Sequence, residues 1–140
     1  MVYTSTVSTI GLPQKIWTGQ LSGDFGVKLG NEDTPVQAHH LAGNYKRSKS
    51  QAEQLALRKA REGFPVVVVN PTAPMGPWDV KPTPTGQMVL DFLRGRIPAY
   101  LNTGMNLVDV EDVAAGHILA MERGSPGQRY ILGNTNLTLK

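Results

Sequence analysis

The apolar positions change their period along the chain, and each change marks a predicted element. Residues 2–10 are rich in β-branched and aromatic side chains, which predicts a strand that runs into a loop. Residues 11–43 hold no sustained period and predict a long loop. Small and apolar residues recur every three to four positions over 44–62, which predicts a helix that stops at Gly63. The β-branched run 66–69 then predicts a strand buried in a parallel sheet, and strand, helix and strand form an α/β crossover unit.

The second half of the chain predicts shorter elements. The six prolines between residues 65 and 84 predict a stiff, shaped loop with few N–H donors. A short helix is predicted over 86–95, and Asp109 is expected to cap a longer helix over 110–123. Three residues of that longer helix are expected to form its buried stripe: Ala114, Ile118 and Met121. A last short strand is predicted at 128–132.

Composition excludes several classes of protein. The 140 residues are 40% apolar and 18% charged, as in an ordinary globular domain. No apolar run approaches the roughly 20 residues of a membrane-spanning helix, and the first residues lack a signal-peptide pattern, so we expect a cytoplasmic protein without a membrane span. The absence of cysteine excludes disulfide scaffolds and thiol nucleophiles. A net charge of +3 is too small to indicate nucleic-acid binding.

Two polar pairs have a plain structural explanation. His39 and His40 are adjacent, so their side chains point apart, and no third ligand accompanies them. We therefore predict no metal site. Asp109 and Asp112 could be paired carboxylates, yet capping and the positive helix end explain both.

Tyr45 and Lys49 are the candidate chemical pair. Their spacing of four residues places a phenol and an ammonium on one face of the predicted helix. A tyrosine near its ordinary pKa of about 10 is a poor acid or base at neutral pH, and a nearby cation lowers that pKa. Such a tyrosine can move a proton to or from a substrate oxygen. The spacing alone is a weak signal, so the flanking sequence must decide.

The flanking sequence supports a chemical role for Tyr45 and Lys49 at two points. The hydroxyl-rich strand end 3–6 precedes the helix, and 70–73 ends the next strand, so all three motifs meet at the carboxyl edge of a parallel sheet. These motifs in this order resemble the extended short-chain dehydrogenase/reductase superfamily, with its NAD-dependent epimerases, dehydratases and dihydroflavonol-reductase-like enzymes. Within it, four stretches look most like the hopanoid-associated sugar epimerase group: Gly43–Lys49, Asn70-Pro71 with Gly76-Pro77, Asp79–Gly86, and Asn106–Val110.

The resemblance implies a role for each candidate residue. Thr6 would hydrogen-bond the reacting oxygen, Tyr45 would be the acid/base, and Lys49 would lower the pKa of Tyr45 and hold the nicotinamide ribose. The cofactor would be NAD or NADP. Besides Tyr45 and Lys49, three residues would contact it through their backbone: Pro71, Thr72 and Ala73. A sugar or sugar nucleotide would contact Thr6, Tyr45 and Lys81.

The implied fold is α/β, a partial Rossmann-type parallel sheet plus part of a small substrate domain. Residues 1–74 would be the C-terminal part of the dinucleotide-binding domain. Residues 75–140 would be mainly substrate-domain segments with interleaved return elements of the Rossmann domain. The sequence has no strand, Gly-x-x-Gly-x-x-Gly turn and helix to receive a pyrophosphate. We therefore expect it to correspond to the middle two-fifths of an enzyme and to be inactive by itself.

Two functions of different class remain open. One is a fragment of a NAD(P)-dependent epimerase, dehydratase or reductase that transfers hydride, whose parent enzyme could be a homodimer. The other is a non-catalytic remnant or interaction module that lacks the glycine-rich cofactor half. The combination of Thr6, Tyr45 and Lys49 favours the enzyme. Nothing in the sequence decides between NAD and NADP.

Overall fold

The computed structural model describes residues 1–12, 29–97 and 104–138. The middle of the predicted loop, residues 13–28, lies outside the described residues. The elements, in chain order, are β1 (Val2–Thr4), the 3-10 helices η1 (Val7–Thr9) and η2 (Ala38–His40), α1 (Asn44–Arg61), β2 (Val67–Pro71), β3 (Ala73–Met75), α2 (Pro84–Leu93), β4 (Gly104–Asp109), α3 (Val110–Arg123), β5 (Arg129–Leu132) and β6 (Thr135–Thr138).

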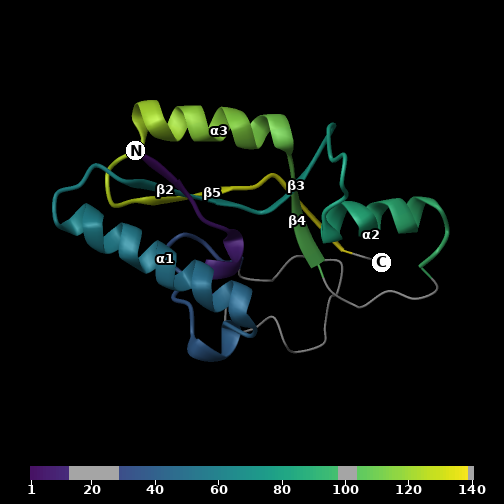
Figure 1. Cartoon of the computed structure of the whole chain (residues 1–140), viewed down its shortest axis with the longest axis horizontal. Helices are drawn as coiled ribbons and strands as arrows, with labels where there is room; N and C mark the ends of the chain where they lie inside the picture. Colours follow the sequence, from purple (N-terminus) through teal and green to yellow (C-terminus); the bar gives the residue numbers. More distant parts are fainter. Residues whose placement is uncertain (13–28, 98–103, 139–140) are drawn as a thin grey trace.

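The first sheet has the strand order β1-β2-β5, and all its strands are parallel. Thr4 pairs with Val69, and Val69 pairs with Tyr130 on the other side. Helices α1 and α3 cover opposite faces of this sheet (Figure 1). The predicted crossover of strand, helix and strand is therefore confirmed.

The core lies around β2. Val68 and Val69 are fully buried, as the β-branched run predicted for a strand covered on both faces. Val67 and Val69 pack with Ala120 of α3, and three partly buried residues surround them: Val2, Tyr130 and Leu132.

The buried stripe predicted for α3 is wrong. Ala114 is exposed, and so are Ile118 (54%) and Met121 (65%). The helix instead approaches the sheet through small residues at four-residue spacing, Gly116, Ala120 and Gly124. A Cβ on Gly116 would lie 2.8 Å from Cδ2 of Leu132, and one on Gly124 would lie 2.8 Å from Cγ1 of Val67. Close approach of the backbone thus turns the larger apolar side chains away from the sheet.

The second sheet has the strand order β3-β4-β6, with β3 parallel and β6 antiparallel to β4. Figure 1 shows this sheet and α2 beyond the ends of β2 and β5. Asp109 caps α3 as predicted, because its carboxylate accepts from the N–H of Glu111 at 2.8 Å. Helix α2 begins two residues before its predicted start, where Thr83 accepts from the N–H of Gly86. In the ranges placed by the structure, no helix combines the length and apolarity needed to cross a membrane.

Candidate active site

The ends of β1 and β2 meet beside α1. The N–H of Ser5 donates to the carbonyl of Val69 at 2.8 Å, which carries the strand pairing one residue past β1. From α1, the Lys49 ammonium donates to the carbonyl of Thr4 at 3.0 Å. From β2, the Asn70 amide donates to the carbonyl of Thr6 at 3.1 Å. The strand end that carries Thr6 is therefore held from both neighbouring elements, as the order of the motifs predicted.

Thr6 keeps a hydroxyl proton that it can donate. Its backbone is extended, and its Oγ1 caps η1 by accepting from the N–H of Ser8 at 3.3 Å. The Ser8 hydroxyl donates to the same oxygen, also at 3.3 Å. Because Thr6 accepts in both bonds, its own O–H can still bind an oxygen of a ligand.

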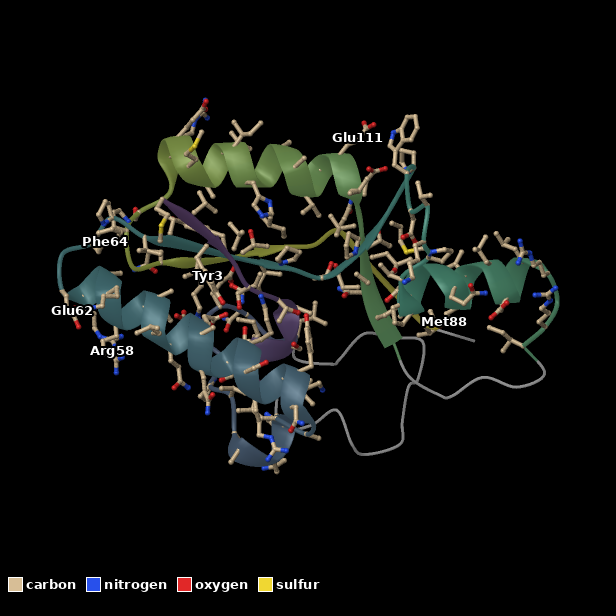
Figure 2. All side chains as sticks on the ribbon, in the orientation of Figure 1. Tyr3, Arg58, Glu62, Phe64, Met88 and Glu111 are labelled. Carbon is tan, nitrogen blue, oxygen red and sulfur yellow. The ribbon has the colours of Figure 1, made fainter. Side chains whose placement is uncertain are left out.

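Tyr45 and Lys49 lie on the first two turns of α1. The helix follows Gly43, whose φ of +86° is a left-handed conformation that favours glycine. Tyr45 is 64% exposed. Lys49 reaches inward, with its ammonium 5.5 Å from the centroid of the Tyr3 ring. Figure 2 shows Tyr3 between the sheet and α1. Within the described residues no hydrogen bond joins the Tyr45 hydroxyl to Lys49 or Thr6, so their joint action stays a prediction.

The predicted cofactor turn is fixed between the two sheets. Both the N–H and the hydroxyl of Thr72 donate to the carbonyl of Leu132, at 3.0 and 3.3 Å. Ala73 opens β3 and pairs with Leu107. Pro71 ends β2. These bonds leave the turn little freedom to move. A backbone segment that is to contact a nicotinamide ring needs such a fixed position.

A cavity of about 420 Å³ lies next to these motifs, although Thr6, Tyr45 and Lys49 are not among its described lining residues. Its lining contains the residue after Thr6, the residue after Tyr45, and Thr72 itself. Its described lining residues are Val7, Ser8, Ile10, Gly11, Leu12, Leu29, Gly30, His40, Lys46, Thr72, Asn106, Ile131, Gly133, Asn134 and Asn136. A volume of this size suits a small organic molecule. Lys81, predicted to bind substrate, is exposed in the loop before α2 and does not line this cavity.

The sequence interpretation missed a buried polar cluster behind the site. Glu53 is 3% exposed, and its Oε2 accepts from the Ser5 hydroxyl, from Oγ1 of Thr9 at 2.5 Å and from Nδ2 of Asn70 at 2.7 Å. Its Oε1 pairs with Nη1 of Arg129 at 3.1 Å. The available signal was spacing, since Glu53 follows Lys49 by one helical turn in a helix otherwise rich in basic residues.

The same cluster extends to the edge of the first sheet. Arg129 also donates to the backbone carbonyl of Glu32, and the Glu32 carboxylate accepts from the N–H of Ile131 at 2.9 Å. Oδ1 of Asn70 is buried and has no hydrogen-bond partner in the described structure. A buried acceptor without a partner costs free energy, so the amide is held by what its Nδ2 binds.

Comparison with known proteins identifies the family. The family model described as NAD dependent epimerase/dehydratase matches residues 1–133. The chain belongs to this family. A putative dihydroflavonol 4-reductase from Synechocystis is 50% identical over 143 residues, which cover 99% of this chain and 38% of that protein. Among solved structures, gox2253 is 48% identical with a TM-score of 0.85 and is covered over 39% of its chain.

The epimerase/dehydratase family confirms the predicted fold class and resemblance. PA4631, a nucleoside-diphosphate-sugar epimerase from Pseudomonas aeruginosa, is 26% identical with a TM-score of 0.78 over 99% of this chain and 42% of its own. This chain thus spans about two-fifths of the length of these relatives. The family depends on NAD, as expected. The predicted division at residue 74 and the hopanoid-associated group stay predictions.

Proposed function

We propose that this chain supplies the proton-transfer site and nicotinamide-facing turn of a NAD(P)-dependent epimerase, dehydratase or reductase. One observation carries the proposal. In a chain of this family, Thr6, Lys49 and the turn 71–73 converge on the ends of β1 and β2 beside a cavity for a small molecule. In this arrangement residues 1–74 act as the C-terminal part of the cofactor domain, and 75–140 contribute mainly to the substrate domain, with interleaved elements that return to the cofactor domain.

The donors and backbone at this edge fit a nicotinamide ribose. An ammonium has three N–H donors, and Lys49 uses one on the Thr4 carbonyl, which leaves two for ribose hydroxyls. The fixed backbone of Thr72 and Ala73 offers a flat wall for the ring. NAD or NADP, when bound there, supplies or accepts the hydride.

The proton chemistry falls to this chain's own residues. Thr6 donates its free O–H to the reacting oxygen and orients it. Tyr45 gives a proton to that oxygen when a carbonyl is reduced and removes it when an alcohol is oxidised. Its exposure in this structure leaves the phenol accessible to a substrate.

The cavity wall suits a ring with hydroxyl groups. Asn134 and Asn136 offer amide Nδ2 groups, since the Asn106 amide already binds these two residues, while Val7 and Ile131 offer apolar surface. We therefore keep a sugar or sugar nucleotide as the proposed substrate. Lys81 would reach it only from the loop outside this cavity, so its role rests on the sequence alone.

A chimera tests the function. Residues 1–140 replace the matching stretch of the Synechocystis relative, which supplies the rest of an enzyme, and turnover is followed by nicotinamide absorbance with a dihydroflavonol and with a nucleotide sugar. Tyr45→Phe is expected to lower turnover by about a hundredfold or more, because a positioned acid/base contributes that much. Tyr130→Phe is the matched control on β5, away from the cavity.

Two outcomes would contradict the proposal. Turnover of the Tyr45→Phe chimera at the rate of the unsubstituted chimera would show that the phenol moves no proton. An inactive chimera, with an active parent under the same assay, would favour the non-catalytic remnant or interaction module instead.

A further inference from the structure

Helix α1 presents three functional groups on one face. Tyr45, Lys49 and Glu53 follow one another at four-residue spacing, so they stand above one another along the helix. Lys49 and Glu53 both bind the strand end that carries Thr6, whereas Tyr45 lies on the exposed first turn. The site proposed above gives Tyr45 the proton transfer and Lys49 the ribose hydroxyls, and it gives Glu53 no task.

The contacts of Glu53 bracket Thr6. Ser5, immediately before Thr6, donates its hydroxyl to the carboxylate. Oγ1 of Thr9 lies 2.5 Å from the carboxylate and 2.7 Å from the carbonyl of Thr6. Nδ2 of Asn70 likewise lies near both, at 2.7 and 3.1 Å. The Asn70 amide has two N–H donors and therefore links the carboxylate to the Thr6 backbone, whereas the single hydroxyl proton of Thr9 serves one of these two acceptors at a time.

This arrangement is costly unless every partner is present. A carboxylate that is 3% exposed loses its hydration, and only a counter-ion and hydrogen-bond donors offset that loss. Arg129 supplies the charge, and Ser5, Thr9 and Asn70 supply the donors. A carboxylate with a full set of partners has one defined position. It can therefore set the position of what it binds.

We propose that Glu53 is a positioning residue that locks the end of β1 onto α1, so that the Thr6 hydroxyl keeps a fixed place relative to Tyr45 and Lys49. That the position of the Thr6 hydroxyl matters for catalysis rests on the proposed function. That Glu53 fixes this position does not rest on it, and the fixed position can be measured without turnover.

The test uses the full 140-residue chain with Glu53→Gln, which keeps the size of the side chain and removes its charge. NMR follows the methyl signal of Thr6 and the hydrogen exchange of the Thr9 amide, which donates to the Thr6 carbonyl at 3.1 Å. We expect the Thr6 signal to shift and Thr9 exchange to rise by about tenfold, while amides in the middle of α1 keep their rates. Glu62→Gln, which breaks an exposed ion pair with Lys59, is the control at the C-cap of the same helix and changes neither signal.

Two results would overturn the proposal. One is an unchanged Thr6 signal with unchanged Thr9 exchange. The other is equal acceleration of all amides in α1 and β2, which indicates general loss of stability rather than lost positioning. Thr9→Val keeps the shape of the side chain and removes the hydroxyl that lies within hydrogen-bond distance of both Glu53 and the Thr6 carbonyl. We expect Thr9→Val to shift the Thr6 methyl signal in the same direction as Glu53→Gln does. If Glu53→Gln does not fold, an unchanged Thr6 signal in Thr9→Val overturns the proposal.

The chimera separates this proposal from the function. There Glu53→Gln is expected to lower kcat by roughly tenfold, with a much smaller change in KM for the cofactor, because a misplaced hydroxyl affects the chemical step. If Tyr45→Phe leaves turnover unchanged, the proposed function fails while the NMR result on Thr6 stands. If Tyr45→Phe abolishes turnover and the Thr6 signal ignores Glu53→Gln, only the positioning role fails.

Discussion

Tyr3 shows at the residue scale how a buried carboxylate affects its neighbours. Its pKa is raised above the ordinary value of 10.0, first because partial burial disfavours the phenolate and second because the negative charge of Glu53 does the same. The folded chain therefore holds the Tyr3 proton to higher pH than the unfolded chain does.

This shift makes stability depend on pH. The contribution of Tyr3 is fully present below the unfolded pKa, near 10, and is lost as pH rises through the raised folded pKa. We expect the wild-type chain to lose more stability than Tyr3→Phe over that alkaline range, measured as urea midpoints at successive pH values. Parallel pH dependences for the two proteins would show that Tyr3 titrates alike in both states. Glu53→Gln should bring the Tyr3 pKa closer to 10.

The sequence predicts the location of some residues of the candidate site and not of others. Thr6, Lys49 and Thr72 were predictable because their place follows from strand order and helix period, and the structure brings their strand ends together. Glu53 was not, because a lone acid among basic residues has the pattern of a solvated helix face. Its burial depends on Arg129, which joins it from 76 positions away in the chain.

At the scale of elements, α3 shows what hydropathy patterns leave out. The sequence predicted that Ile118 and Met121 pack against the sheet, because burial of large apolar side chains contributes most to the free energy of folding. The helix instead lies close to the sheet along Gly116, Ala120 and Gly124, where there is no room for a larger side chain. The existence and limits of the helix followed from its cap and period, whereas its rotation depends on the shape of the sheet.

A larger side chain at Ala120 should therefore push α3 off β2. Ala120→Leu is expected to lower the free energy of unfolding by about 1–3 kcal/mol, because the packed site cannot expand without strain. Ala115→Leu, at an exposed position of the same helix, should change it by less than about 0.5 kcal/mol. Urea unfolding of both variants gives the comparison. Equal effects would mean that Ala120 does not face the sheet.

A side-chain hydrogen bond protects the outer edge of β5. The Glu32 carboxylate accepts from the outward N–H of Ile131, so a side chain binds the edge of β5 on which the described sheet has no further strand. Glu32→Ala is expected to speed exchange of the Ile131 amide by about tenfold, while Glu32→Gln, which keeps an acceptor, changes it much less. Exchange that is the same in wild type and Glu32→Ala would show that the cap gives no protection.

At the scale of the whole molecule, the chain spans about two-fifths of the length of its relatives. It belongs to a NAD-dependent family, yet within residues 1–12, 29–97 and 104–138 no glycine-rich turn joins a strand to a helix that could receive the pyrophosphate. Large apolar side chains such as Phe92 (69%) and Leu93 (74%) of α2 are exposed. Fold class and crossover could be read from the sequence because they rest on local periods. The cavity could not, because it forms where residues from both sheets meet.

We therefore expect the purified chain not to bind NADH detectably, whereas the chimera with the Synechocystis relative binds it. NADH fluorescence measured on equal concentrations of the two proteins makes the comparison. Lys49 and the turn at Thr72 contact only the nicotinamide side in the proposed site, so most of the contacts with the dinucleotide would be lacking. Saturable binding by the chain alone would contradict this expectation.

The position of β1 has one more consequence. It is a three-residue outer strand whose only partner in the described sheet is β2, and it leads directly into Thr6. Outer strands with few backbone bonds open in local fluctuations far more often than a molecule unfolds. Mild heat or denaturant would then displace the hydroxyl while α1, α3 and the valine core remain intact. Local opening of β1 and denaturation would be separate events in this protein, and cooling could reverse the first before the second begins.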